Sequence, residues 1–187
     1  MTLDRWIELG LFVLNVGCSY LSARRVPAAW LLGMATYPGY LYLMWGQGLY
    51  NEIVTQTVLF LMSIFGWLLW RNQAGELKVF YAGPGSRALL AVGTLAAGLV
   101  MGFVGLKMGA QYPFLNGLGT VLYPVCTFLL ARRWVEAWYG FIITNFVYMA
   151  LFALTDFWWL VGCHVVYQAL AFKGLFEWRR SFATQSF

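Results

Sequence analysis

Charged side chains are scarce in this chain. Asp, Glu, Lys and Arg make up only 10% of its 187 residues, whereas 61% are hydrophobic. A soluble domain usually has about a quarter charged residues. The scarcity therefore excludes an ordinary soluble domain and predicts an integral membrane protein in a lipid bilayer. The net charge of +5 is no sign of a nucleic-acid partner, because the cations stand in pairs at the ends of apolar runs.

Residues that bind metals or carry out catalysis are also few. The chain has one histidine and three cysteines, and Cys18, Cys126 and Cys163 lie far apart inside apolar runs. This spacing excludes a metal or redox motif and predicts reduced, structural thiols. No carboxylate pair or nucleophile–base set is visible, which argues against an intramembrane enzyme, the reading from another class. We expect no catalytic residue, cofactor or metal ion.

Apolar runs of membrane-spanning length predict an all-α protein with seven transmembrane helices. They are Trp6–Ala23, Ala28–Trp45, Leu49–Trp70, Ala88–Met108, Phe114–Ala131, Val135–Ala153 and Phe157–Trp178. Connections are short except for the stretch between Arg71 and Arg87, which contains Gly-Pro-Gly. Gln56 lies near the middle of the third run, where its amide needs a partner inside the protein.

The distribution of cations predicts the orientation. One side collects Arg24, Arg25, Arg71, Lys78, Arg87, Arg132, Arg133, Arg179 and Arg180, with Lys173 nearby, whereas the other has Arg5 and Lys107. Because cytoplasmic loops are rich in Lys and Arg, the N-terminus is expected outside and the C-terminus in the cytoplasm.

The chain repeats itself after 108 residues. Without a gap, 16 of the 59 positions from Val13 to Arg71 are identical to those 108 residues later, including Ala-Arg-Arg at 23–25 and 131–133. Internal duplication explains this identity best. A fourth helix between two three-helix units keeps them parallel, which predicts a 3+1+3 arrangement. The units are residues 1–71, 72–112 (a cytoplasmic loop and linker helix) and 113–187. Such repeats are typical of transporters and argue against a seven-helix receptor.

Several motifs together resemble the PnuC-type vitamin transporter family over nearly the whole chain. They are Leu49-Tyr50, Gln56, Gly66-Trp67 and Trp70; Ala131-Arg132-Arg133, Glu136, Trp138 and Asn145; and Tyr167, Gly174 and Glu177-Trp178-Arg179-Arg180. The resemblance implies a SWEET-like fold in a bacterial inner membrane. It also implies uptake of unphosphorylated nicotinamide riboside, thiamine or riboflavin by facilitated diffusion with alternating access, and trapping by a cytosolic vitamin kinase.

Two departures from the family pattern concern the substrate. The nicotinamide riboside pattern on the sixth helix is Trp-x-x-Trp-x-x-x-Asn, and here Phe141 replaces the second tryptophan. On the third helix, Leu59 stands where the family often has tyrosine. Thiamine is therefore as good an expectation as nicotinamide riboside. Riboflavin, a sugar or an ion-coupled substrate remain alternatives, and homo-oligomerisation is left open.

Helical spacing predicts where the substrate binds. Trp138, Phe141, Asn145 and Tyr148 share one helical face; its aromatic rings suit a planar or cationic ring, and the amide suits hydroxyl or pyrimidine groups. Residues equivalent in the repeat, Gln56 with His164 and Tyr37 with Asn145, are expected at equal depth. Weaker candidates are Trp67, Tyr167 and Asn116, with Thr120 one turn after Asn116. The alternative for all of them is packing, interfacial anchoring or helix–helix hydrogen bonding.

Overall fold

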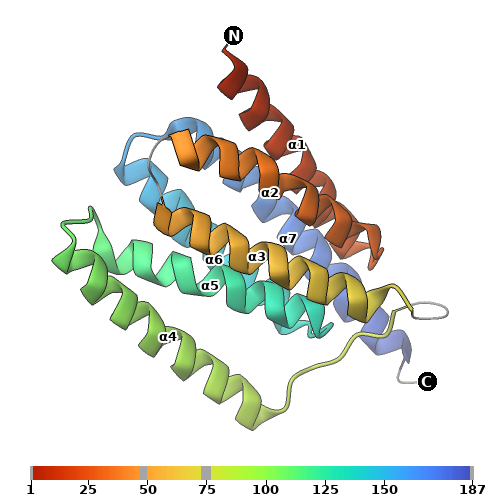
Figure 1. Ribbon diagram of the computed structural model, residues 1–187. Coiled ribbons are helices and arrows are strands. Elements are labelled where there is room, and N and C mark those ends of the chain that lie inside the picture. The colour runs from red at the N-terminus through yellow and green to blue at the C-terminus, as the bar shows by residue number, and fades with distance from the viewer. Residues whose placement is uncertain (1, 47–49, 73–76, 186–187) are drawn as a thin grey trace.

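The computed structural model describes residues 2–46, 50–72 and 77–185, and these form seven helices (Figure 1). Their bounds are α1 Leu3–Ala23, α2 Ala28–Gly46, α3 Tyr50–Trp70, α4 Pro84–Lys107, α5 Pro113–Ala131, α6 Glu136–Leu154 and α7 Trp158–Gln185. In these residues the extended backbone is limited to an isolated bridge between Phe80 and Trp134. The all-α prediction is thereby confirmed.

The predicted segments agree with the helices except at two ends. Helix α4 begins at Pro84 rather than Ala88, with proline in the first turn, where its missing N–H costs no hydrogen bond. Helix α7 continues past Trp178 to Gln185 because this polar end packs on the protein: Ser181 is buried. Leu49, part of the third predicted segment, lies outside the described residues.

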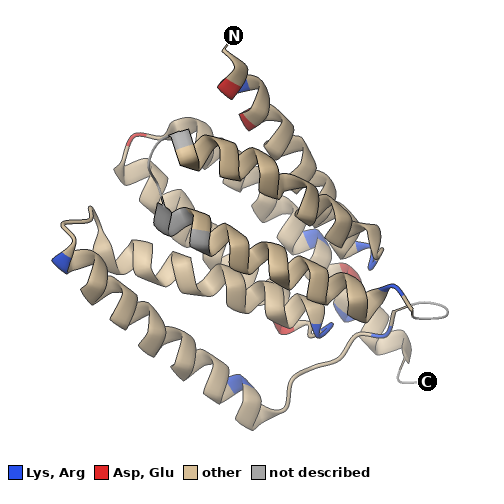
Figure 2. Ribbon diagram, viewed as in Figure 1, with Lys and Arg blue, Asp and Glu red and all other residues tan. Residues whose placement is uncertain are grey.

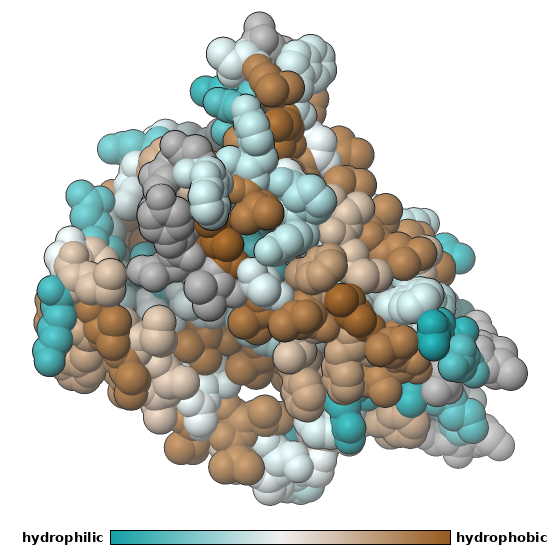
Figure 3. Space-filling view, in the orientation of Figure 1, coloured by the Kyte–Doolittle hydropathy of each residue, from teal (hydrophilic) through white to brown (hydrophobic). Residues whose placement is uncertain are grey.

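Five helices are long and apolar enough to cross a membrane: α1, α4, α5, α6 and α7. In α3 the described apolar run is shorter, Thr55–Trp70. The chain is thus a multi-pass membrane protein, and the crossings of α2 and α3 stay predictions. Figure 3 shows apolar side chains spread over the visible face, with hydrophilic ones gathered at its edges.

Six helices form a closed ring of neighbours. Each half packs in chain order, α1 on α2 on α3 and α5 on α6 on α7, and the halves meet where α1 contacts α7 and α3 contacts α5. Helix α4 lies along one edge, and among the described residues it packs on α5 alone (Figure 1). Their approach is close because a Cβ at Gly117 would lie 2.5 Å from the backbone nitrogen of Gly102.

Basic residues gather at one end of the ring, here called the basic end. Figure 2 shows most Lys and Arg residues near the ends of α1, α3, α5 and α7 that carry Arg24, Arg71, Arg132 and Arg179. The buried core also lies towards this end, because it joins Ala23, Trp30, Ala131 and Trp138, all near helix ends, into one cluster. The protein is therefore packed most tightly at its basic end.

Four tryptophans join the two halves in that core. The rings of Trp30 and Trp70 meet edge to face at 5.3 Å, those of Trp138 and Trp178 at 5.6 Å, and those of Trp70 and Trp178 at 6.2 Å. We call these four residues the tryptophan quartet. Its first pair is related to its second by the 108-residue shift.

The quartet is held by two hydrogen bonds that cross between the halves. Trp70 Nε1 donates to the carbonyl oxygen of Ala131 at 3.1 Å, and Trp178 Nε1 donates to that of Ala23 at 3.1 Å. A shift of 108 residues converts one bond into the other. The same relation holds in the helix turns, where Arg25 and Arg133 both adopt positive φ, 58° and 62°.

Candidate functional site

His164 lies at the centre of a cluster of polar and aromatic side chains between α6 and α7. Its Nδ1 is 3.1 Å from Oδ1 of Asn145, which is buried. Since an amide oxygen accepts, the imidazole donates from Nδ1 and leaves Nε2 as an acceptor. The Tyr148 ring stacks on the imidazole at 5.3 Å with an interplanar angle of 27°, and Phe152 lies 5.5 Å away. Asn145 lies about 13 Å along the axis from the start of α6, near the middle of the helix.

Tyr167 joins this cluster to the first half. Its ring meets His164 edge to face at 5.4 Å and lies 5.9 Å from Phe12 of α1. We use the name His164 cluster for Asn145, Tyr148, Phe152, His164, Tyr167 and Phe12. The structure thus brings together four predicted site residues from two helices: Asn145, Tyr148, His164 and Tyr167.

The equivalent place in the first half has a different chemistry. Tyr37, which the repeat relates to Asn145, has its hydroxyl 3.2 Å from Oγ1 of Thr57 and its ring 4.8 Å from Phe60. Gln56, which the repeat relates to His164, precedes Thr57 on α3 and is half-buried. The predicted equivalence in depth is thus matched by equivalent α2–α3 and α6–α7 contacts.

Phe141 and Trp138 lie on α6 between the His164 cluster and the quartet. The Phe141 ring is 5.9 Å from both Trp138 and Tyr123. Trp138 is only 2% exposed, and its ring lies against Gly174, where an added Cβ would be 2.5 Å away. In this conformation Trp138 is a packing residue; its contact with substrate stays a prediction.

Two predicted residues lie apart from the cluster. Trp67 is at the basic end of α3, with the guanidinium of Arg71 4.6 Å from its ring, about 16 Å along the helix from Gln56. Asn116 lies in the first turn of α5, where its carbonyl accepts from Thr120 Oγ1 at 3.0 Å. These contacts match the alternatives of interfacial anchoring and local backbone bonding.

Sequence reasoning missed Asn15 and Tyr40. Asn15 Nδ2 donates to the Tyr40 hydroxyl at 2.9 Å and to the carbonyl of Leu11 at 2.8 Å. The repeat contained a sign of this, because Tyr40 is identical to Tyr148 after the shift and Asn15 is replaced by Tyr123. Phe12 and Phe152 carried no such sign, since an isolated phenylalanine in an apolar helix does not reveal its neighbours.

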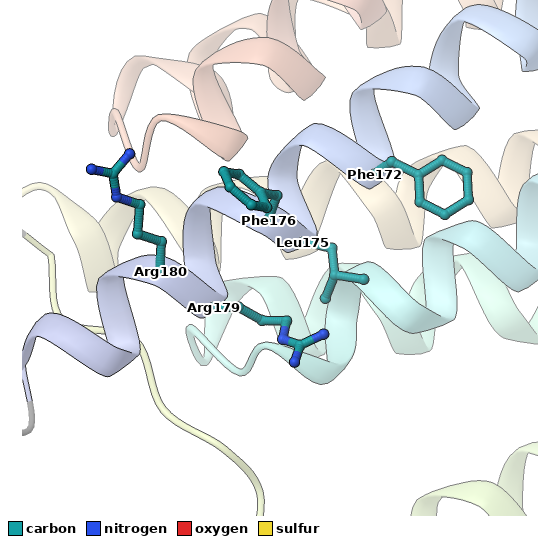
Figure 4. A pocket seen from close by; sticks show the side chains of 5 residues that line it. All are labelled: Phe172, Leu175, Phe176, Arg179 and Arg180. Carbon is teal, nitrogen blue, oxygen red and sulfur yellow. The ribbon is translucent and has the colours of Figure 1, made fainter.

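A hollow on the outer surface is not this site. It is lined by Phe172, Leu175, Phe176, Arg179 and Arg180 of α7 (Figure 4). Phe172 and Phe176 are 52% and 69% exposed, so they face the surroundings of the bundle. The hollow shares no residue with the His164 cluster.

The His164 cluster offers aromatic faces, an amide and an imidazole, and it contains no Arg or Lys. Aromatic faces attract flat or cationic rings, and amides bind hydroxyl groups. Phosphate recognition normally uses Arg or Lys. The described residues contain no group of three or more His, Cys, Asp and Glu side chains suited to a metal ion.

The helical fold and this intramembrane polar site define a multi-pass membrane protein of the transporter class. The chain belongs to the nicotinamide mononucleotide transporter family, whose model matches residues 5–180. The resemblance to the PnuC family is thereby confirmed.

Individual relatives agree. The chain is 22% identical to the nicotinamide riboside transporters PnuC of Escherichia coli K12 and of Shigella flexneri, over 94% of this chain and 86% of each relative. It also matches the crystal structure of the vitamin B3 transporter PnuC with a TM-score of 0.80 at 20% identity, over 97% of this chain and 83% of that one. This match shows the fold.

Proposed function

We propose that this protein carries unphosphorylated nicotinamide riboside across the bacterial inner membrane. Family membership over residues 5–180 is the observation that carries the proposal. The relatives' printed substrate now favours nicotinamide riboside over thiamine. The family's name mentions a nucleotide, but the His164 cluster lacks the basic side chain that a phosphate would need. A neutral, aromatic site therefore supports the nucleoside.

We infer that transport is facilitated diffusion with alternating access between two three-helix repeats in a SWEET-like 3+1+3 arrangement. The bonds that Trp70 and Trp178 exchange between the halves support parallel repeats. The cations at the basic end place that end in the cytoplasm, with the N-terminus outside. A cytosolic kinase that phosphorylates the vitamin would then trap it.

Uptake into proteoliposomes tests the substrate. Radiolabelled nicotinamide riboside, thiamine and riboflavin are supplied separately, with an excess of unlabelled vitamin inside for counterflow. The expected result is counterflow of nicotinamide riboside at least tenfold above protein-free vesicles. Thiamine counterflow alone would reassign the substrate, and no counterflow with any of the three would overturn the proposal.

A proton-coupled carrier is the second candidate, because the single histidine lies inside the cluster. Coupling would make a pH gradient drive net accumulation of nicotinamide riboside in kinase-free vesicles. Facilitated diffusion predicts equal inside and outside concentrations with or without the gradient.

A further inference from the structure

The connection before α4 is buried where a loop would ordinarily be exposed. Residues Leu77–Ala82, here called the strap, contain no helix, yet Leu77, Val79 and Ala82 are 4%, 1% and 3% exposed. Leu77 and Val79 belong to the same buried cluster as the tryptophan quartet. The strap therefore forms part of the core at the basic end.

Backbone hydrogen bonds tie the strap to the second half. Phe80 N donates to the carbonyl of Arg133 at 2.9 Å, and Val135 N donates to the carbonyl of Phe80 at 2.9 Å. These bonds form the bridge that pairs Phe80 with Trp134 in the turn between α5 and α6. Val79 N donates to Oε1 of Gln185 on α7 at 3.3 Å. The strap thus spans two elements of the second half.

Glu136, the first residue of α6, fastens the other end of the strap. Its Oε2 accepts from Ala82 N at 3.1 Å, and its Oε1 pairs with Arg87 Nε at 2.7 Å. Arg87 also lies 5.3 Å from the ring of Tyr81, which meets Phe182 of α7 edge to face at 4.8 Å. One carboxylate therefore connects α6, the strap and the start of α4.

The opposite end of the ring has no comparable closure among the described residues. There Leu3 and Trp6 of α1 are 63% and 58% exposed, and Trp158 and Trp159 of α7 are 64% and 54% exposed. Residues near helix ends are deeply buried only at the basic end. A substrate in the His164 cluster that moved between the halves towards the basic end would meet first the quartet and then the strap.

We propose that the strap is the cytoplasmic gate of the carrier and that Glu136 is its latch. The gate opens when the Phe80–Trp134 bridge and the Glu136 contacts break while the helices stay folded. Hydrogen bonds and one ion pair, rather than a helix, hold the strap, so it can leave without unfolding a membrane-spanning segment. As a gate, the inference rests on the proposed transport function.

A cross-link tests the gate. Phe80→Cys and Trp134→Cys are combined in a protein whose native cysteines are replaced by alanine, and oxidation joins the two thiols. With the cross-link complete by mass spectrometry, nicotinamide riboside binding should stay within twofold, whereas counterflow should fall at least tenfold and return on reduction. The oxidised single variants are the controls. Unchanged counterflow in the fully cross-linked protein would overturn the proposal.

Hydrogen exchange supplies a second measurement that needs neither a substrate nor the cross-linked variant to fold. Amides of the strap in the unmodified protein should exchange at least tenfold faster than those of Cys126–Ala131 in α5. Glu136→Gln should speed strap exchange further, and pairing Glu136→Arg with Arg87→Glu should restore part of the protection. Strap exchange as slow as that of α5 would overturn the gate. If the unmodified protein carries no vitamin, the proposed function fails, while exchange still decides whether the strap opens.

Discussion

The two halves of the molecule agree at the basic end and differ at mid-membrane. At the basic end, residues 108 apart are identical and make the same contacts, as Trp70 with Ala131 and Trp178 with Ala23 do. Near the middle of the helices, Asn145 and His164 in the second half stand where the first half has Tyr37 and Gln56. The identical residues build a two-fold frame, and the residues that differ build an asymmetric site.

The largest expected effect tests the asymmetry of the site. Asn145→Ala removes the amide that contacts His164 at 3.1 Å, and we expect about a hundredfold loss of nicotinamide riboside affinity, about 2.8 kcal/mol. Tyr37→Phe, the matched change in the first half, should cost about threefold. Tryptophan fluorescence quenching measures both affinities. Equal losses would mean that both halves contribute equally to the site.

The next effect tests the symmetry of the frame. An added Cβ would lie 2.4 Å from the Trp30 ring at Gly66 and 2.5 Å from the Trp138 ring at Gly174. Gly66→Ala and Gly174→Ala should therefore each lower the free energy of unfolding by about 2 kcal/mol through overpacking. Thermal unfolding in detergent gives the comparison. Gly10→Ala, where nothing lies within 4 Å, is the control, and a loss in only one half would break the symmetry.

Smaller losses are expected from the bonds that cross between the halves. Trp70→Phe and Trp178→Phe each remove the indole donor while keeping an aromatic ring. Each should cost about 1 kcal/mol in the free energy of unfolding. The cost should be slightly greater for Trp178, whose Nε1 also lies 3.2 Å from the carbonyl of Ser22. Chemical denaturation in detergent measures this, and no change in either variant would show that the bonds do not stabilise the frame.

The smallest effect concerns the repeated cysteines. Cys126 is 1% exposed and lies 3.8 Å from Thr144 Oγ1, whereas Cys18 is only half-buried. Cys126→Ala should cost about 1 kcal/mol and Cys18→Ala less, because a buried thiol acts mainly as a small apolar group. Thermal unfolding of the two variants checks the order. The reverse order would show that burial does not set their contribution.

Much of the fold could be predicted from the sequence because a membrane imposes length and apolarity on each helix. The helix boundaries and the frame residues follow from apolar runs and from the repeat. The candidate site was only partly predictable. Asn145 and His164 stand out as polar residues in apolar helices, whereas Phe12 and Phe152 look like any lipid-facing phenylalanine. Trp138 stood on the predicted face, but its ring packs on Gly174.

By itself, the sequence determined that this is a helical membrane protein with a duplicated frame and a basic end, since composition, helical length and internal identity are properties of the chain. Only the tertiary structure decided which side chains meet. It joined His164 to Asn145 and Tyr148, set four tryptophans between the halves, and folded Leu77–Ala82 into the core. The physical reason is that contacts between helices depend on packing and on hydrogen bonds across distant segments, which periodicity along one helix does not contain.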